Sequence, residues 1–204
     1  MGLKTGHIPL GHFPSGSFPD GHWPHPPVYI VSLDEMKNQL RVDFDDDDRL
    51  IAGLMRAATE WAEEFQRRFY ISRPAYMYMD RFDGAIRPVY SPLVSVGSIK
   101  YVDENGTLQL LADTDYRVDT GTEPGIIEPA WTLSWPATRD ITNAVIIEYT
   151  AGYGGADDVP DDIKSAVMMM VCHLYENRSA VAGKKVAVPK GVKEMLRKRK
   201  LVSL

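Results

Sequence analysis

The fold is decided by residues 47–69, which read DDRLIAGLMRAATEWAEEFQRRF. Apolar side chains recur here at spacings of three and four residues, the period of an α-helix. These side chains belong to Leu50, Ile51, Leu54, Met55, Ala58, Trp61, Ala62, Phe65 and Phe69. Asp46 or Asp47 is a suitable N-cap, and the aspartates complement the positive end of the helix dipole. Most charged residues lie off the apolar stripe, so the stretch predicts a helix that packs on one side only.

Shorter helical patterns stand on either side of this helix in the sequence. Ser32 and Glu35 have the spacing of a capping box and predict a helix over residues 32–41. Pro160 and the acids around it favour a helix start, and an apolar stripe extends the pattern over residues 160–179. A break at Gly183–Pro189 is followed by a short basic helix, Gly191–Lys200.

Between the helices, from about residue 73 to residue 153, the apolar period changes to two. Turn residues recur throughout, and Asn105-Gly106 is a strong signal for a tight turn. The expected strands are residues 76–82, Val94–Val102, Thr107–Leu111, Tyr116–Asp119, Gly125–Glu128, Trp131–Trp135 and Ala144–Thr150. We therefore predict an α+β fold, in which a small helical bundle of two main amphipathic helices and short helices carries an antiparallel β insertion.

The first 27 residues form a five-residue repeat in which glycine recurs and proline follows three positions later. Proline restricts its predecessor to extended backbone and glycine adds conformational entropy, so neither a helix nor a central strand is expected. An extended arm of twenty such residues would reach roughly 60 Å in a polyproline-like conformation. Its regular apolar residues are candidate anchors on another chain: Ile8, Phe13, Phe18 and Trp23. A disordered tail is the open alternative, because the isolated repeat buries nothing.

Charge is distributed unevenly along the chain. The net charge is −5, but residues 184–204 hold eight Lys or Arg against one Glu. The basic residues that we expect to dock on a partner are Lys193, Arg197, Lys198, Arg199 and Lys200. Those expected at contacts between copies are Asp45, Asp46, Asp47, Asp48, Arg49 and Arg56. Such polarity suits head-to-tail contacts or an acidic partner, and two solvated faces are the alternative.

The sequence contains no recognisable catalytic chemistry. It has no nucleophile elbow, Walker loop, dinucleotide fingerprint or zinc spacing, and its single cysteine, Cys172, cannot form an internal disulfide. We therefore predict no catalytic, cofactor-binding or metal-binding residues. No apolar stretch approaches the roughly 18 residues of a spanning helix, so we expect no membrane contact and a location in the cytoplasm.

Several stretches together resemble the head-tail connector (adaptor) proteins of long-tailed phages and related gene-transfer particles. The first is VSLDEMKNQLRVD at residues 31–43, followed by the acidic cap and the long helix. The others are SPLVSVGSIKYVD at 91–103, Trp135-Pro136, IEYTAGY at 147–153, and VPDDIKSA at 159–166 with HLYENR at 173–178. They occur in the family's order and cover roughly residues 28–180.

We expect three segments: an arm at 1–27, a connector domain at 28–183 and a basic tail or helix at 184–204. The resemblance covers the connector domain, whereas the arm and the tail match nothing in the family's pattern. The resemblance implies a structural virion protein at the head-tail interface, made in the host cytoplasm, that forms a ring around a channel for DNA. The implied partners are other copies of the chain, expected as a dodecamer on the portal, together with the portal protein and head-closure or tail proteins. DNA would pass without sequence specificity, and no cofactor is needed. The alternative is a nucleic-acid-binding accessory protein that uses the basic C-terminal helix.

Overall fold

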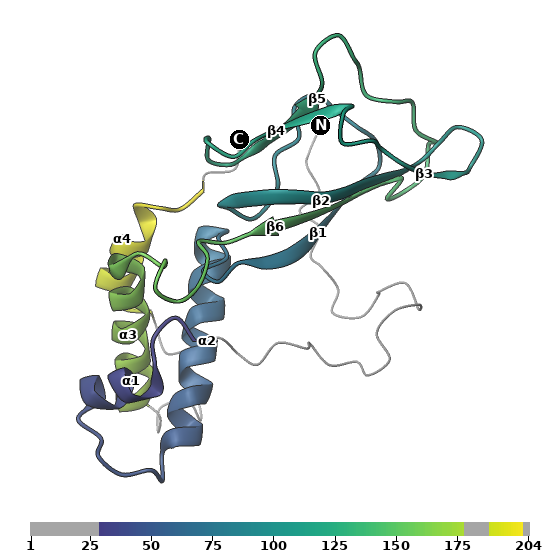
Figure 1. Ribbon diagram of the computed structural model, residues 1–204. Helices are drawn as coiled ribbons and strands as arrows, with labels where there is room; N and C mark the ends of the chain where they lie inside the picture. Colours follow the sequence, from purple (N-terminus) through teal and green to yellow (C-terminus); the bar gives the residue numbers. More distant parts are fainter. Residues whose placement is uncertain (1–28, 178–187, 202–204) are drawn as a thin grey trace.

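The computed structural model describes residues 29–177 and 188–201. Within these described residues four helices form a bundle, and between α2 and α3 the chain leaves it to build six strands (Figure 1). The strands lie beyond one end of the bundle, in a four-stranded sheet and a separate two-stranded one. The predicted α+β fold with an antiparallel insertion is confirmed.

The first helix, α1 (Leu33–Leu40), begins at the predicted capping box. The backbone N–H of Glu35 donates to the Ser32 hydroxyl, and the Glu35 carboxylate accepts from the backbone N–H of Ser32 at 2.9 Å. The helix ends at Arg41, whose φ of 58° lies in the left-handed region. This turn directs the chain back towards the start of α2.

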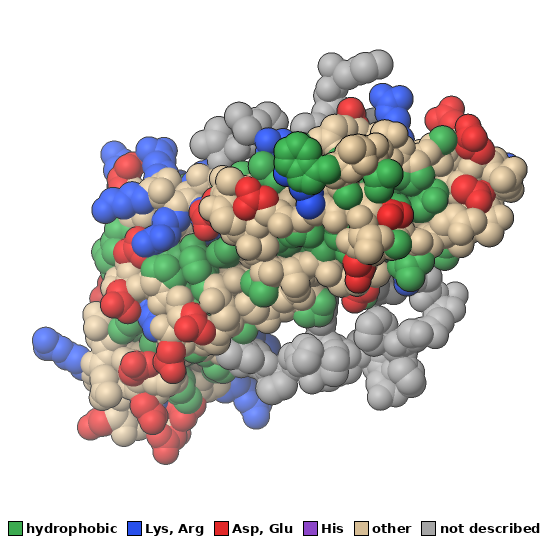
Figure 2. Space-filling model, turned by 45° about the horizontal axis from the view of Figure 1, so that its top comes forward, with side chains coloured by type: hydrophobic (Ala, Val, Ile, Leu, Met, Phe, Trp, Pro, Cys, Tyr) green, Lys and Arg blue, Asp and Glu red, His purple; other side chains and the backbone are tan. Residues whose placement is uncertain are grey.

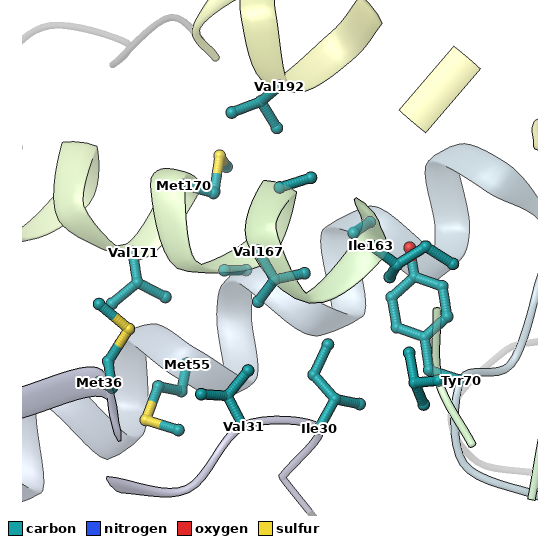
Figure 3. Close-up of a cluster of buried hydrophobic side chains, with 14 of the residues drawn as sticks. Ile30, Val31, Met36, Met55, Tyr70, Ile163, Val167, Met170, Val171 and Val192 are labelled. Atoms are coloured by element: carbon teal, nitrogen blue, oxygen red, sulfur yellow. The ribbon is translucent and has the colours of Figure 1, made fainter. Parts of the chain in front are cut away.

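The long helix, α2 (Asp48–Gln66), packs on α3 (Asp161–Glu176) along the predicted apolar stripe. Met55 and Ala58 from α2 and Val167 from α3 are buried in one cluster. The short helix α4 (Lys190–Arg197) belongs to the same cluster, because Val192 and Leu196 are almost completely buried against α3 (Figure 3). The last basic helix is therefore an integral part of the bundle.

The four-stranded sheet has the order β1-β6-β2-β3, and all its neighbours are antiparallel. Its strands are β1 (Arg73–Met79), β2 (Leu93–Val102), β3 (Leu108–Leu110) and β6 (Val145–Ala151). The hairpin of β4 (Tyr116–Asp119) and β5 (Ile126–Pro129) lies over one face of this sheet (Figure 1). A second apolar cluster, which includes Ile99, Ile127 and Ile147, fills the space between them.

Two expectations from the sequence are wrong. Trp131–Trp135 is not a strand: Thr132 has a φ of 71°, the backbone N–H of Leu133 turns back to Ala130, and Trp131 is 82% exposed. The apolar composition favoured a strand, but the segment has no neighbouring strand with which to pair. Phe69 does not extend α2, because Arg67 ends the helix in a left-handed conformation and Phe69 packs in the β cluster.

Candidate interaction surfaces

The C-terminal segment after α4 is held against the end of α2 by Gln66, which is completely buried. Its side-chain Nε2 donates to the carbonyl of Leu196 at 2.6 Å, and its own backbone carbonyl accepts from the N–H of Leu201 at 3.1 Å. The Gln66 side-chain oxygen accepts from the Tyr70 hydroxyl at 2.7 Å. One glutamine therefore binds the chain on both sides of residues 197–200 and fixes where the basic residues lie.

Arg68 connects this C-terminal segment to the β insertion. It is 5% exposed, and its guanidinium donates to three oxygens: the backbone carbonyl of Arg199, the carboxylate of Glu123 and the Tyr153 hydroxyl. Hydrogen bonding to Arg68 holds the pKa of Glu123 below its usual range. A charged group this deeply buried is tolerated because its donors are satisfied. The loop between β4 and β5 is thus tied to the C-terminal segment through one side chain.

Glu63 and Arg73 form a further polar contact between bundle and sheet. Together with Gln66 and Arg68 they make up a mostly buried group of hydrogen-bonded residues that we call the polar joint. The Glu63 carboxylate accepts from the backbone N–H of Tyr70 and from Arg73, both at 2.8 Å. Burial raises the pKa of Glu63, although Arg73 counteracts the rise. Glu63 is one of the charged residues that the helical pattern places off the apolar stripe, yet it is only 5% exposed.

The five basic residues predicted to dock on a partner lie together on α4 and the turn that follows it. Three of them already make contacts within the subunit. Arg197 pairs with Glu194 at 2.8 Å, Arg199 pairs with Asp162 at 3.0 Å, and the Lys200 ammonium lies 4.4 Å from the centre of the Phe65 ring. Among the described residues, no ion pair is recorded for Lys193 or Lys198. These two are therefore the basic groups best placed to meet a partner.

The acidic block is divided between internal contacts and the surface. Asp45 and Asp48 both pair with Lys37, at 2.6 and 2.8 Å, and the Lys37 ammonium lowers the pKa of Asp45. Asp47 is the N-cap of α2, but its side chain accepts from the Tyr175 hydroxyl and does not cap the helix. The exposed members of the predicted contact set are Asp45, Asp46, Arg49 and Arg56.

The two charged groups lie at opposite ends of the bundle (Figure 2). Lys and Arg side chains gather over α4, whereas Asp and Glu side chains dominate the end that holds α1 and the start of α2. One subunit therefore presents unlike charges at two separate places. In general, unlike charges at separate places on one surface favour head-to-tail contacts over contacts between identical ends.

Some predicted site residues are not tested by this structure. The arm anchors Ile8, Phe13, Phe18 and Trp23 lie outside the described residues. Within residues 29–177 and 188–201, no group of three or more His, Cys, Asp or Glu side chains could hold a metal ion. Among the helices of that same part, none is long and apolar enough to cross a membrane.

The sequence did not reveal that Gln66, Arg68 and Glu123 connect segments that lie far apart in the chain. Their partners lie 55 to 131 positions away in the sequence, so no local spacing could reveal them. The available signal was the polar run Gln66-Arg67-Arg68 between two apolar stretches, at a point where the chain must leave the bundle.

Comparison with known protein families gives one match, and it lies in the first part of the described chain. Residues 30–82 match the family model described as phage gp6-like head-tail connector protein. No curated protein sequence matches the chain significantly.

Similar solved structures come from particles called gene transfer agents. A chain in the neck of an empty particle, computed with C6 symmetry, superposes with a TM-score of 0.70 at 23% identity, over 87% of this chain and 93% of that one. A chain in the native virion gives 0.71 at 22% identity, over 87% and 93%. A chain in the native neck, computed with C12 symmetry, gives 0.65 at 23% identity, over 84% and 89%.

At this level of identity the superpositions show a shared fold. The resemblance to phage head-tail connector proteins is confirmed, by the family match over residues 30–82 and by a fold shared with neck proteins over most of the chain.

Proposed function

We propose that this protein is a structural component of a virion or phage-like particle, located at the interface between head and tail. The observation that carries this proposal is the connector-family match over α1, α2 and the start of the β insertion, together with the fold shared with neck proteins. The work of such a protein is adhesion, and it requires no cofactor and no bond-making chemistry.

Copies of the chain form a ring, expected as a dodecamer, between the portal and the head-closure or tail components. The neck of the native gene transfer agent was computed with C12 symmetry, which supports a ring of this order. Rings of identical subunits use heterologous contacts, and the acidic and basic ends of the bundle suit that geometry. The exposed Asp46, Arg49 and Arg56 stand at the acidic end. DNA passes through the channel of the ring without sequence specificity.

The basic end of the bundle docks on the portal protein through Lys193 and Lys198. Gln66 and Arg68 fix the backbone of this end at Leu196 and Arg199, so the backbone from which these two lysine side chains extend is in place before the partner arrives. Preorganisation of this kind lowers the entropy cost of binding. The three other basic residues already have contacts within the subunit, which leaves a small positive surface for nucleic acid and makes the accessory DNA-binding alternative the weaker one.

Assembly on the portal tests the proposal. Purified protein is mixed with the portal protein of the same particle and examined by size exclusion and negative-stain microscopy. We expect a monomer alone and a ring on the portal in the mixture. A stable dimer that ignores the portal contradicts the proposal. A DNA shift assay on the same samples separates the alternative, because phosphate binding must weaken steeply as salt rises.

A further inference from the structure

One face of the four-stranded sheet presents several exposed apolar side chains, and no described helix packs on it. Its middle row crosses all four strands, because Tyr78 lies opposite Ile146, Ile146 opposite Lys100, and Lys100 opposite Leu110. Tyr76 lies two residues before Tyr78 and therefore on the same face. This outer face is the side of the sheet that does not meet the β4–β5 hairpin, since Met77 and Ile147 point into the opposite, buried cluster.

The side chains of the outer face are unusually exposed for their type. Tyr76 and Tyr78 are 41% and 45% exposed, and Leu108 and Leu110 are 59% and 66% exposed. Within residues 29–177 and 188–201, no helix makes an extensive contact with this sheet. Antiparallel sheets commonly leave one face in water, but that face is then mainly polar. Here the exposed tyrosines of β1 and the exposed leucines of β3 lie on either side of Lys100, and apolar side chains gathered in this way on one face mark a binding surface.

The outer face holds few charges, and one of them, Glu148, already has partners within the sheet. Glu148 accepts from the Ser98 hydroxyl at 3.1 Å and lies 3.5 Å from the Tyr76 hydroxyl. Lys100 is the exposed cation of the middle row. A strongly charged partner would gain little here. The segment that fits should be apolar, nearly uncharged and able to stack on tyrosine rings.

The N-terminal arm of this chain has that chemistry. Residues 1–27 contain one Lys and one Asp, and each five-residue repeat places an apolar residue directly before a proline. Proline-rich segments bind to surfaces lined by aromatic rings, because their extended backbone loses little entropy on binding. The arm carries only Lys4 and Asp20 as fully charged side chains, so its electrostatic attraction to the acidic or basic end of the bundle is weak.

The dimensions of the repeat and of the sheet also agree. A five-residue repeat advances about 15 Å in a polyproline-like conformation, at about 3.1 Å per residue. Tyr78 on β1 and Leu110 on β3 are separated by three strand spacings, or about 14 Å at about 4.8 Å each. Two successive repeats that cross the strands would thus place one apolar-proline pair over Tyr78 and the next over Leu110.

We propose that the outer face of the sheet, centred on Tyr76, Tyr78 and Leu110, is the docking site of the N-terminal arm of this chain. The arm residues that contact it are the regularly spaced anchors, Phe13 and Phe18 foremost. The inference does not depend on the role in the virion: it concerns the purified protein, and it stands or falls separately from assembly on the portal.

Photo-crosslinking in the full chain tests this docking. Phe13 is replaced by p-benzoylphenylalanine, the protein is irradiated, and the cross-linked peptides are identified by mass spectrometry. We expect the cross-links to concentrate on β1, β6 and β3. A mixture of isotopically light and heavy protein shows whether the arm reaches its own sheet or that of another copy, and either result supports the proposal. Cross-links concentrated on the helices, or spread evenly over the surface, would overturn it.

A surface variant makes the test specific. The variant combines three substitutions, Tyr76→Ser, Tyr78→Ser and Leu110→Ser. The cross-linking yield on the sheet should fall about tenfold, because loss of aromatic anchors at the centre of an interface costs more than one factor of ten in affinity. The matched control combines Phe44→Ser and Leu50→Ser, exposed apolar residues at the far end of the bundle, and should leave the yield unchanged. Circular dichroism verifies that both variants fold. An unchanged yield in the folded sheet variant would refute the docking site.

Discussion

Replacement of Gln66 by alanine should destabilise the protein far more than an ordinary polar substitution on a helix. The side chain is completely buried and makes two hydrogen bonds, to the Leu196 carbonyl and from the Tyr70 hydroxyl. Gln66→Ala leaves the Tyr70 hydroxyl buried without its acceptor, at about 1–3 kcal/mol. It also removes one hydrogen bond of the Leu196 carbonyl, which still accepts from the backbone N–H of Arg199, at about 1 kcal/mol. We therefore expect a loss of about 3 kcal/mol in the free energy of unfolding. For a chain of this size the unfolding midpoint should fall by about 6–12 °C.

The assay is chemical denaturation followed by circular dichroism, with a double-mutant cycle. Tyr70→Phe removes the hydroxyl that donates to Gln66, so the two changes share one hydrogen bond and should be non-additive by about 1 kcal/mol. Glu60→Ala, an exposed position on the same helix, is the control and should change stability by less than about 0.5 kcal/mol. A Gln66→Ala effect as small as that of Glu60→Ala would refute the inference that this glutamine holds the C-terminal segment in place.

Three further predictions follow from the same contacts. Leu196→Ala should cost about 2–5 kcal/mol in denaturant unfolding, because α4 is part of the bundle core; a cost near zero would mean that α4 is only an appendage. The pKa of Glu123 is lowered by Arg68, so its contribution to stability is full above the pKa of the unfolded state and is lost as pH falls through the lowered value. Glu123→Gln should therefore reduce the acid-dependent fall of the thermal midpoint, and an unchanged pH profile would count against the ion pair. Lys193→Glu combined with Lys198→Glu should weaken portal binding in a pull-down or by calorimetry, whereas the charge-matched Arg81→Glu with Arg87→Glu should not; equal effects would contradict docking through α4.

The periodic elements of this fold are visible in the sequence because their cause is local. In the apolar stripe from Ile51 to Ala62, successive members are separated by only a few residues. The two residues of the capping box, Ser32 and Glu35, are just as close, so spacing alone predicts both features. The same holds for β4, whose predicted and observed bounds coincide at Tyr116–Asp119.

What the sequence hides is the polar joint. Glu63, Gln66 and Arg68 are residue types that usually face water, and a pattern based on hydrophobicity places them there. Gln66 and Arg68 are buried because partners distant in the sequence satisfy their hydrogen bonds, Leu196 for Gln66 and Arg199 for Arg68. The partners of Glu63 are nearer, but they lie beyond the end of α2, where the helical pattern gives no information. The wrong prediction of a strand at Trp131–Trp135 has a related cause. A strand forms only beside a partner strand, and the amino-acid composition of a segment does not reveal whether it has one.

Charge clustering in the sequence shows where charged residues gather, but it does not show which of them are already paired. The basic residues on and after α4 do lie together, yet Arg197 and Arg199 pair with acids of the same subunit. Asp45 and Asp48 likewise bind Lys37. A run of like charges in a sequence says nothing about which members are already neutralised, and only the three-dimensional arrangement singles out Lys193 and Lys198.

Imaging of intact particles at side-chain resolution tests the central claim most directly. The account predicts a closed ring of this protein between portal and tail, with Lys193 and Lys198 on the side that meets the portal. Finished particles that lack the protein would contradict it.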